Sequence, residues 1–201
     1  MTTLVLARHG QTVWHQENRY AGISDVDLTD AGVRQAAALA DWSRLHRPDA
    51  VYVSPIRRAR ETAAPTLAAL GIEGTVVEDL REVDFGVGEG RTMAELAVEM
   101  PSVVAEYRRN PAANPLPDAE SVVTAAERGS AALRVIAADH HAGTVLVVAH
   151  NTLLRLALCQ LLDIPVARYR GIFPRLENGA LSTICIPDDG LVSLLSLNVP
   201  L

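Results

Sequence analysis

The chain contains no lysine, so all 18 of its basic residues are arginines. This absence excludes a P-loop lysine and any chemistry that runs through a lysine Schiff base. The 24 acidic residues leave a formal net charge of −6. Such a balance argues against a broad nucleic-acid-binding surface, which needs a basic patch. Any positively charged site must therefore be local and built from arginine.

Cysteines, aromatic residues and long apolar runs are also scarce. Cys159 and Cys185 each lie in an apolar segment, and no C-x-x-C pair or Cys/His spacing indicates a zinc site. Aromatic residues make up 4% of the chain, so the core must consist mostly of small aliphatic side chains. No apolar run approaches the roughly eighteen residues that span a bilayer, and the first residues do not resemble a signal peptide. We therefore expect a cytoplasmic protein with buried thiols and no membrane partner.

Short apolar runs alternate with segments of helical spacing along the chain. Ser54 as N-cap and Pro55 at the first position predict the start of one helix, which Pro65 should bend or divide and Gly71 should end. The alternation predicts an α/β fold, a three-layer sandwich with a mainly parallel central sheet. Strands are expected at 3–7, 50–53, 75–77, 144–149, 180–186 and 191–197, with a turn at 187–190, and helices from Thr29 onward and at 54–70, 92–100, 121–139 and 151–162.

Two histidines stand directly after continuously apolar strands. These are His9 and His150, and ligands of open α/β sheets bind at the carboxyl ends of such strands. If the two strands are neighbours, the two histidines face each other. The helix that follows another strand carries Arg57, Arg58 and Arg60 in its first turn. A helix N-terminus favours anions, and the arginine fork fits phosphate oxygens, so the pattern predicts a phosphate site.

Four segments resemble, in order, the signature motifs of the histidine phosphatase superfamily, which is also called phosphoglycerate-mutase-like. The segments cover residues from about 3 to 155 and are Arg8-His9-Gly10-Gln11-Thr12, Ser54 to Ala63, Leu80 to Gly86, and Val147-Val148-Ala149-His150. The resemblance implies a phosphoglycerate-mutase-like fold. It also implies a single domain over residues 1–201, with a cap-like insertion at about 93–121.

The resemblance implies roles for five residues. His9 would be the nucleophile that forms a phosphohistidine, while Arg8, Arg58 and His150 would bind the phosphoryl oxygens. Glu82 would protonate the leaving alcohol and then activate the water that attacks the phosphohistidine. No metal or other cofactor is expected, because the arginines neutralise the phosphate.

The motif spacing also decides between rival residues. It selects Arg58 from the arginine triplet, and it favours Glu82 over Asp84 and Glu89 as the acid. Arg57 and Arg60 are then expected to be solvated or to act from behind the site.

Three further residues are expected to contact the substrate: His15, Gly22 and Asn151. Many family members have asparagine where this chain has His15. His15 therefore donates a hydrogen bond to the phosphate, marks an altered substrate, or has only a structural role. The family usually has glycine at the position of Asn151.

We expect a metal-independent phosphomonoesterase that acts on a small phosphorylated metabolite. A cofactor-dependent phosphoglycerate mutase is the alternative, since Tyr107-Arg108-Arg109 resembles a pair of mutase arginines that grips a substrate carboxylate. A phosphate-binding module without turnover is a third reading. The physiological substrate is open, no nucleic-acid partner is expected, and a homodimer is compatible with the sequence.

Overall fold

A mixed sheet of six strands forms the centre of the computed structural model, which describes residues 1–188 and 190–201. The strand order is β3-β2-β4-β1-β5-β6. The first four strands in this order run parallel, whereas β5 lies antiparallel to β1, and β6 lies antiparallel to β5. The strands are β1 (Thr2–Arg8), β2 (Ala50–Val53), β3 (Thr75–Val76), β4 (Thr144–Ala149), β5 (Leu181–Ile186) and β6 (Ser193–Val199).

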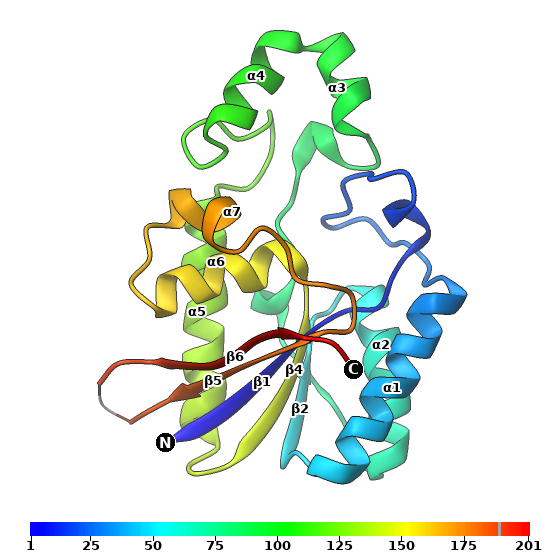
Figure 1. Cartoon of the computed structure of the whole chain (residues 1–201), viewed down its shortest axis with the longest axis vertical. Coiled ribbons are helices and arrows are strands. Elements are labelled where there is room, and N and C mark those ends of the chain that lie inside the picture. Colours follow the sequence, from blue (N-terminus) through cyan, green and yellow to red (C-terminus); the bar gives the residue numbers. More distant parts are fainter. Residues whose placement is uncertain (189) are drawn as a thin grey trace.

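Helices cover both faces of this sheet, so the predicted three-layer α/β sandwich is confirmed (Figure 1). Helices α1 (Asp30–His46) and α2 (Arg57–Leu70) lie on one face, and α5 (Val122–Asp139) and α6 (Asn151–Leu161) lie on the other. A short helix, α7 (Tyr169–Ile172), follows α6. Four 3₁₀ turns complete the regular structure at Val13–His15, Glu78–Leu80, Gly86–Gly88 and Val166–Arg168.

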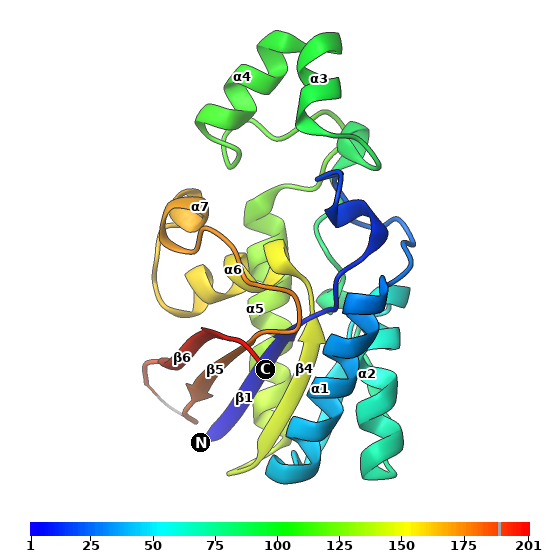
Figure 2. The ribbon, with the colours of Figure 1, turned by 45° about the vertical axis from the view of Figure 1, so that its right-hand side comes forward.

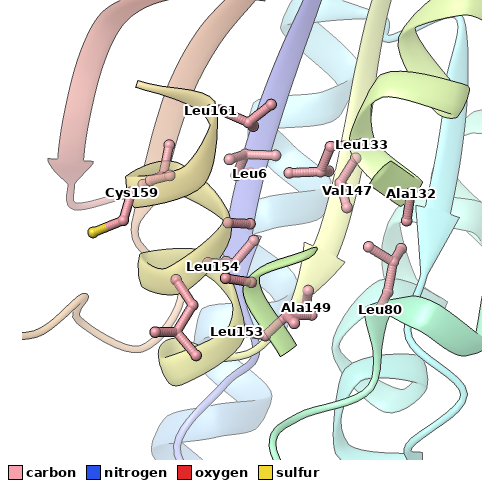
Figure 3. Packing of buried hydrophobic residues seen from close by; sticks show 14 of the residues in the cluster. Leu6, Leu80, Ala132, Leu133, Val147, Ala149, Leu153, Leu154, Cys159 and Leu161 are labelled. Atoms are coloured by element: carbon pink, nitrogen blue, oxygen red, sulfur yellow. The ribbon is translucent and has the colours of Figure 1, made fainter. Parts of the chain in front are cut away.

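The continuously apolar strands explain the two cores. Alternate side chains of a strand point to opposite faces, so Leu4 and Leu6 of β1 pack towards α5 and α6 while Val5 and Ala7 pack towards α1 and α2. Figure 3 shows Leu6 and neighbouring strand residues against leucines of α5 and α6. Cys159 belongs to the first of these cores, and both cysteine thiols are buried and free.

Helices α3 (Met93–Glu99) and α4 (Pro101–Arg109) stand apart from the sheet (Figures 1 and 2). They lie beyond the carboxyl ends of the parallel strands and have a small hydrophobic cluster of their own, made by Leu96, Val104, Tyr107 and Leu116. The sequence predicts the end of α3 at Pro101 but not α4. Pro101 ends one helix and also occupies the first turn of the next, where its missing N–H costs nothing.

The start of α2 differs from the prediction. The helix begins at Arg57 with Ile56 as its N-cap, so Ser54 is not the cap, and Pro65 lies inside one continuous helix. Gly71 ends α2 as predicted, with a φ of 67°. Thr29 caps α1 as predicted, since its hydroxyl accepts a hydrogen bond from the Gly32 amide. The predicted turn at 187–190 includes residue 189, which lies outside the described residues.

The structure describes no helix that is both long and apolar enough to cross a membrane.

Candidate active site

The pairing of β1 with β4 brings the two strand-end histidines together. Arg8 and Ala149 are partners in the parallel register, so His9 and His150 both lie one residue beyond it. Their ring centroids are 5.2 Å apart, and both side chains are buried. The expectation that these two histidines face each other is confirmed.

His9 is held as a neutral imidazole whose Nε2 carries no proton. Its Nδ1 lies 2.8 Å from the Gly10 carbonyl oxygen, which can only accept, so Nδ1 carries the proton. Its Nε2 accepts a hydrogen bond from Nε of Arg58 at 3.2 Å. Burial, together with the charge of Arg58, holds the pKa of His9 well below its usual value. The lone pair of Nε2 is therefore available at neutral pH.

Arg58 is completely buried, and its guanidinium is fixed by backbone carbonyls of the loop after β1. It donates to Ser24 at 2.9 Å, to Ala21 at 3.0 Å and to Gly22 at 2.8 Å. Burial lowers the pKa of Arg58, while the acidic residues Glu82, Glu89 and Asp25 raise it.

The other two arginines of the triplet point elsewhere. Arg57 is exposed and pairs with Asp27 and Glu61, and Arg60 is also exposed. The structure thus places Arg58 alone of the three beside His9.

Gly22 and Glu89 lie behind Arg58. The Glu89 carboxylate accepts hydrogen bonds from the amides of Gly22, Ser24 and Phe85 and from the Ser24 hydroxyl. It thereby holds the loop that carries the carbonyls bound to Arg58. Gly22, which is expected to contact substrate, instead presents its carbonyl to Arg58 and is absent from the cavity wall described below.

Arg8 and His15 form a second pair at the site. Arg8 donates to Nε2 of His15 and to the carbonyl of Leu176, and its Nε is buried without a partner among the described residues. Burial lowers the pKa of Arg8 to about 10, and burial together with the Arg8 charge lowers the pKa of His15 to about 4. His15 is therefore neutral at pH 7, and it accepts from Arg8.

The loop from Phe173 to Asn178 closes this side of the site, and nothing in the sequence pattern singles it out. Its Leu176 amide donates to Oδ1 of Asn151 at 3.0 Å. The side chain of Asn178 donates to the His9 carbonyl at 3.0 Å and lies 3.3 Å from Nε2 of His15. These contacts depend on β5 returning next to β1, which is a pairing of distant segments.

Glu82 is buried beside the site at the N-terminus of α6. Its carboxylate accepts hydrogen bonds from the amides of Val83, Thr152 and Leu153, at 2.8 to 2.9 Å. Of the three candidate acids, Glu82 lines the cavity, whereas Asp84 accepts from the Gly86 amide and Glu89 lies behind Arg58.

His150 contacts Ser54, which the sequence pattern wrongly predicted to be the N-cap of α2. Its Nε2 lies 2.7 Å from the hydroxyl oxygen of Ser54, while its Nδ1 is buried and has no partner among the described residues. Burial, together with Arg58 and Arg8, holds the pKa of His150 well below its usual value. The predicted N-cap serine is thus a neighbour of the second histidine.

A cavity of about 260 Å³ opens over these residues. Arg8, His9 and His15 line it, whereas Arg58 and His150 are fully buried and do not. The wall also includes parts of the loop 18–21 and, from the segment 93–121, Met93. Arg108 and Arg109 are exposed and do not line it, and Arg109 pairs with Glu106. The lining residues are Arg8, His9, Thr12, His15, Asn18, Arg19, Tyr20, Ala21, Glu82, Phe85, Met93, Asn151 and Thr152.

The chain is similar to known phosphatases over nearly its full length. Residues 4–199 match the family described as the histidine phosphatase superfamily, branch 1. Phosphoserine phosphatase 1 of Hydrogenobacter thermophilus is 28% identical over 169 residues, which are 84% of this chain and 80% of that protein. A bifunctional protein of Mycobacterium tuberculosis is 38% identical over 162 residues, which are 78% of this chain and 44% of that protein. The chain thus spans less than half of this second relative.

A solved structure supports the same grouping. The phosphoserine phosphatase of Entamoeba histolytica in complex with 3-phosphoglyceric acid superposes with a TM-score of 0.86 at 26% identity, covering 98% of this chain and 97% of that chain.

Acid is expected to destabilise the fold through these buried histidines. A histidine of the unfolded chain has a pKa of about 6.5, whereas the pKa of His15 is about 4 and those of His9 and His150 are also lowered. As the pH falls below about 6.5, the unfolded chain binds protons that the folded chain does not. The free energy of unfolding should therefore fall, by up to about 1.4 kcal/mol per pH unit for each histidine.

Replacing His15 by asparagine tests this dependence. Urea unfolding of the His15→Asn variant should show a shallower loss of stability between pH 7 and pH 4 than the parent shows, because one of these histidines is gone. Equal slopes for the two proteins would contradict the lowered pKa of His15.

Proposed function

Because the chain belongs to branch 1 of the histidine phosphatase superfamily, we propose that it hydrolyses small phosphomonoesters through a phosphohistidine at His9. The observation that supports this most directly is the state of His9. Its Nε2 is unprotonated, its lone pair accepts one hydrogen bond from Arg58, and the ring lines the cavity beside two arginines and a second histidine. A nucleophile that attacks phosphorus needs this lone pair together with fixed positive charge for the phosphoryl oxygens.

The reaction has two half-reactions. In the first, Nε2 of His9 forms a bond to phosphorus while the ester P–O bond breaks, and the leaving oxygen takes a proton from Glu82. In the second, water attacks the phosphorus, the P–N bond breaks, and the Glu82 carboxylate takes a proton from that water. Arg8, Arg58 and His150 bind the phosphoryl oxygens in both steps.

The surroundings of Glu82 fit a group that moves protons at one fixed place. Two of the amides that bind it, those of Thr152 and Leu153, belong to the first turn of α6. They fix the carboxyl group against the cavity wall, where it can give a proton to the leaving oxygen in the first half-reaction and take one from water in the second.

The cavity favours a phosphatase over a mutase. A mutase needs a grip on the carboxylate of phosphoglycerate, and Arg108 and Arg109 were the residues expected to provide it. Both are exposed on α4, away from the cavity wall. We propose that the segment 93–121 acts as a cap through Met93, and that water is the phosphoryl acceptor.

Replacing the nucleophile should abolish turnover. The His9→Ala variant is expected to hydrolyse p-nitrophenyl phosphate at least about 10³-fold more slowly and to form no acid-labile phosphoenzyme. The assay contains EDTA, because the proposed mechanism uses no metal. His141→Ala, which removes an exposed histidine, is the control and should retain the parent rate.

Other outcomes identify the alternatives. A normal rate in His9→Ala would overturn the mechanism. Phosphate transfer to monophosphoglycerate that depends on bisphosphoglycerate would indicate the mutase. Phosphate binding by the parent protein without turnover of any phosphomonoester would indicate the binding module.

The acid can be tested through the leaving group. Glu82→Gln should lower kcat/KM, which reports the first half-reaction, by about 10²–10⁴-fold for alkyl phosphates. It should lower kcat/KM for p-nitrophenyl phosphate much less, because a nitrophenolate leaves without protonation. Glu89→Gln is the comparison, since Glu89 supports the loop behind Arg58 and should slow both esters equally. An equal loss on both esters in Glu82→Gln would contradict its role as the acid.

A further inference from the structure

One side of the cavity wall is apolar, although Thr12, Asn18, Asn151 and Thr152 also line the cavity. The apolar side includes Tyr20, Phe85 and Met93. The rings of Tyr20 and Phe85 pack with their centroids 4.7 Å apart. Tyr20 also packs against the hydrophobic cluster of α3 and α4, as does Met93. The part of the cavity that would receive the leaving group is therefore continuous with an apolar core.

In the one arginine on this wall besides Arg8, all three guanidinium nitrogens contact a carboxylate or a carbonyl. Nε and NH2 of Arg19 contact the Glu17 carboxylate, both at 2.7 Å. Its NH1 donates to the Gly90 carbonyl at 2.8 Å and to Glu95 at 2.9 Å. Arg19 is paired with two carboxylates, so this group presents no net positive charge to a second anion.

From this wall we infer the class of substrate: phosphomonoesters of uncharged alcohols that carry an aromatic or bulky apolar group. A leaving group with a carboxylate or a second phosphate would lose water at this wall and gain no cation in return. An aromatic leaving group would bury its faces against Tyr20, Phe85 and Met93. The inference rests on the proposed phosphatase activity.

Two primary alkyl esters with similar leaving oxygens test the inference. The parent protein should have a kcat/KM for 2-phenylethyl phosphate at least about tenfold above that for 3-carboxypropyl phosphate. Met93→Arg places a cation on the wall and should lower this ratio by about tenfold. Val98→Arg adds the same charge to the same helix at a side chain that is 84% exposed, and should leave the ratio unchanged.

The possible outcomes distinguish a failure of the inferred substrate class from a failure of the proposed phosphatase activity. A preference of the parent for the carboxylate ester would overturn this inference and leave the phosphatase activity standing. Hydrolysis of neither ester, nor of p-nitrophenyl phosphate, would overturn both.

The contact between Ser54 and His150 determines where the proton of the His150 ring lies. The Ser54 hydroxyl oxygen lies 2.7 Å from Nε2 of His150 and accepts a hydrogen bond from the Ile56 amide at 3.3 Å. Both side chains are fully buried. Among the described residues, the Ser54 hydroxyl has no acceptor for its proton other than His150.

With the proton on Nδ1, one buried group stays unpaired, the Nδ1–H itself; with the proton on Nε2, two do, the Ser54 hydroxyl proton and the Nδ1 lone pair. If Nε2 carried the proton, Ser54 would accept two hydrogen bonds and its own proton would be buried without a partner, at a cost. If Nδ1 carries the proton, the Ser54 hydroxyl donates to Nε2. The unpartnered Nδ1–H is then a donor available to a phosphoryl oxygen.

We propose that Ser54 is a positioning residue that sets this tautomer of His150. It does not touch the phosphate, and its effect on the reaction passes through the histidine ring. Ser54, the serine of the second motif, thus fixes which nitrogen of His150 carries the proton, and it does not cap α2.

Nitrogen-15 NMR of the histidine-labelled protein without substrate measures the tautomer directly. In the parent, Nδ1 of His150 should have the chemical shift of a protonated ring nitrogen, and Nε2 that of an unprotonated one. Ser54→Ala should shift this balance towards the other tautomer and lower kcat/KM by about 10-fold to 100-fold. Ser54→Thr keeps the hydroxyl and should keep the parent shifts.

The parent spectrum alone can overturn the proposal. A protonated Nε2 in the parent would contradict it, and so would an unchanged tautomer in a folded Ser54→Ala variant. Neither result depends on turnover, so a failure here differs from a failure of the proposed phosphatase activity.

Discussion

The site depends on one buried guanidinium. Arg58 is completely buried, and in the described structure no carboxylate forms an ion pair with it. Its charge is instead satisfied by three carbonyls of the loop 21–24 and by the ring of His9. A buried charge is costly unless it is fully hydrogen-bonded, so the loop must take the conformation that supplies these carbonyls. Glu89 holds the loop in that conformation from behind.

The protonation of the histidines follows from the same constraint. Arg58 and Arg8 remain charged when buried, because the guanidinium holds its proton strongly. The pKa values of His9, His15 and His150 are lowered by burial and by these two charges. A lysine in place of Arg58 would lose its charge more readily on burial, and it would have neither a planar fork nor enough donors for the loop and His9 together. A chain whose basic residues are all arginine rather than lysine therefore suits this site, although most of its arginines lie elsewhere.

The sequence predicted those features that depend on local pattern and on the order of the motifs. Strand ends located His9 and His150, and the position directly before alanine selected Arg58 from three arginines. The hydrogen-bond partners of these residues come from distant segments of the chain, so no local pattern in the sequence indicates them. Leu176 and Asn178 reach the site because β5 returns beside β1. Ser54 failed as a predicted cap because a serine before proline has the same local pattern whether its hydroxyl bonds the next turn or a histidine on the neighbouring strand.

The acidic surface and the cationic site do not conflict, because water screens them differently. At physiological ionic strength, exposed charges more than about 8 Å apart interact weakly, and most ion pairs of this chain are exposed. Because Arg58 and Arg8 are buried, their charges would act on the phosphate of the proposed reaction through a medium of lower dielectric than water. The net charge of −6 therefore gives little information about the site. At the cavity wall, by contrast, Glu17 and Glu95 are close enough to matter, because they occupy the donors of Arg19. In the proposed reaction, the arginines and histidines attract the phosphate dianion, whereas Arg19, paired with Glu17 and Glu95, presents no net positive charge to a second anion.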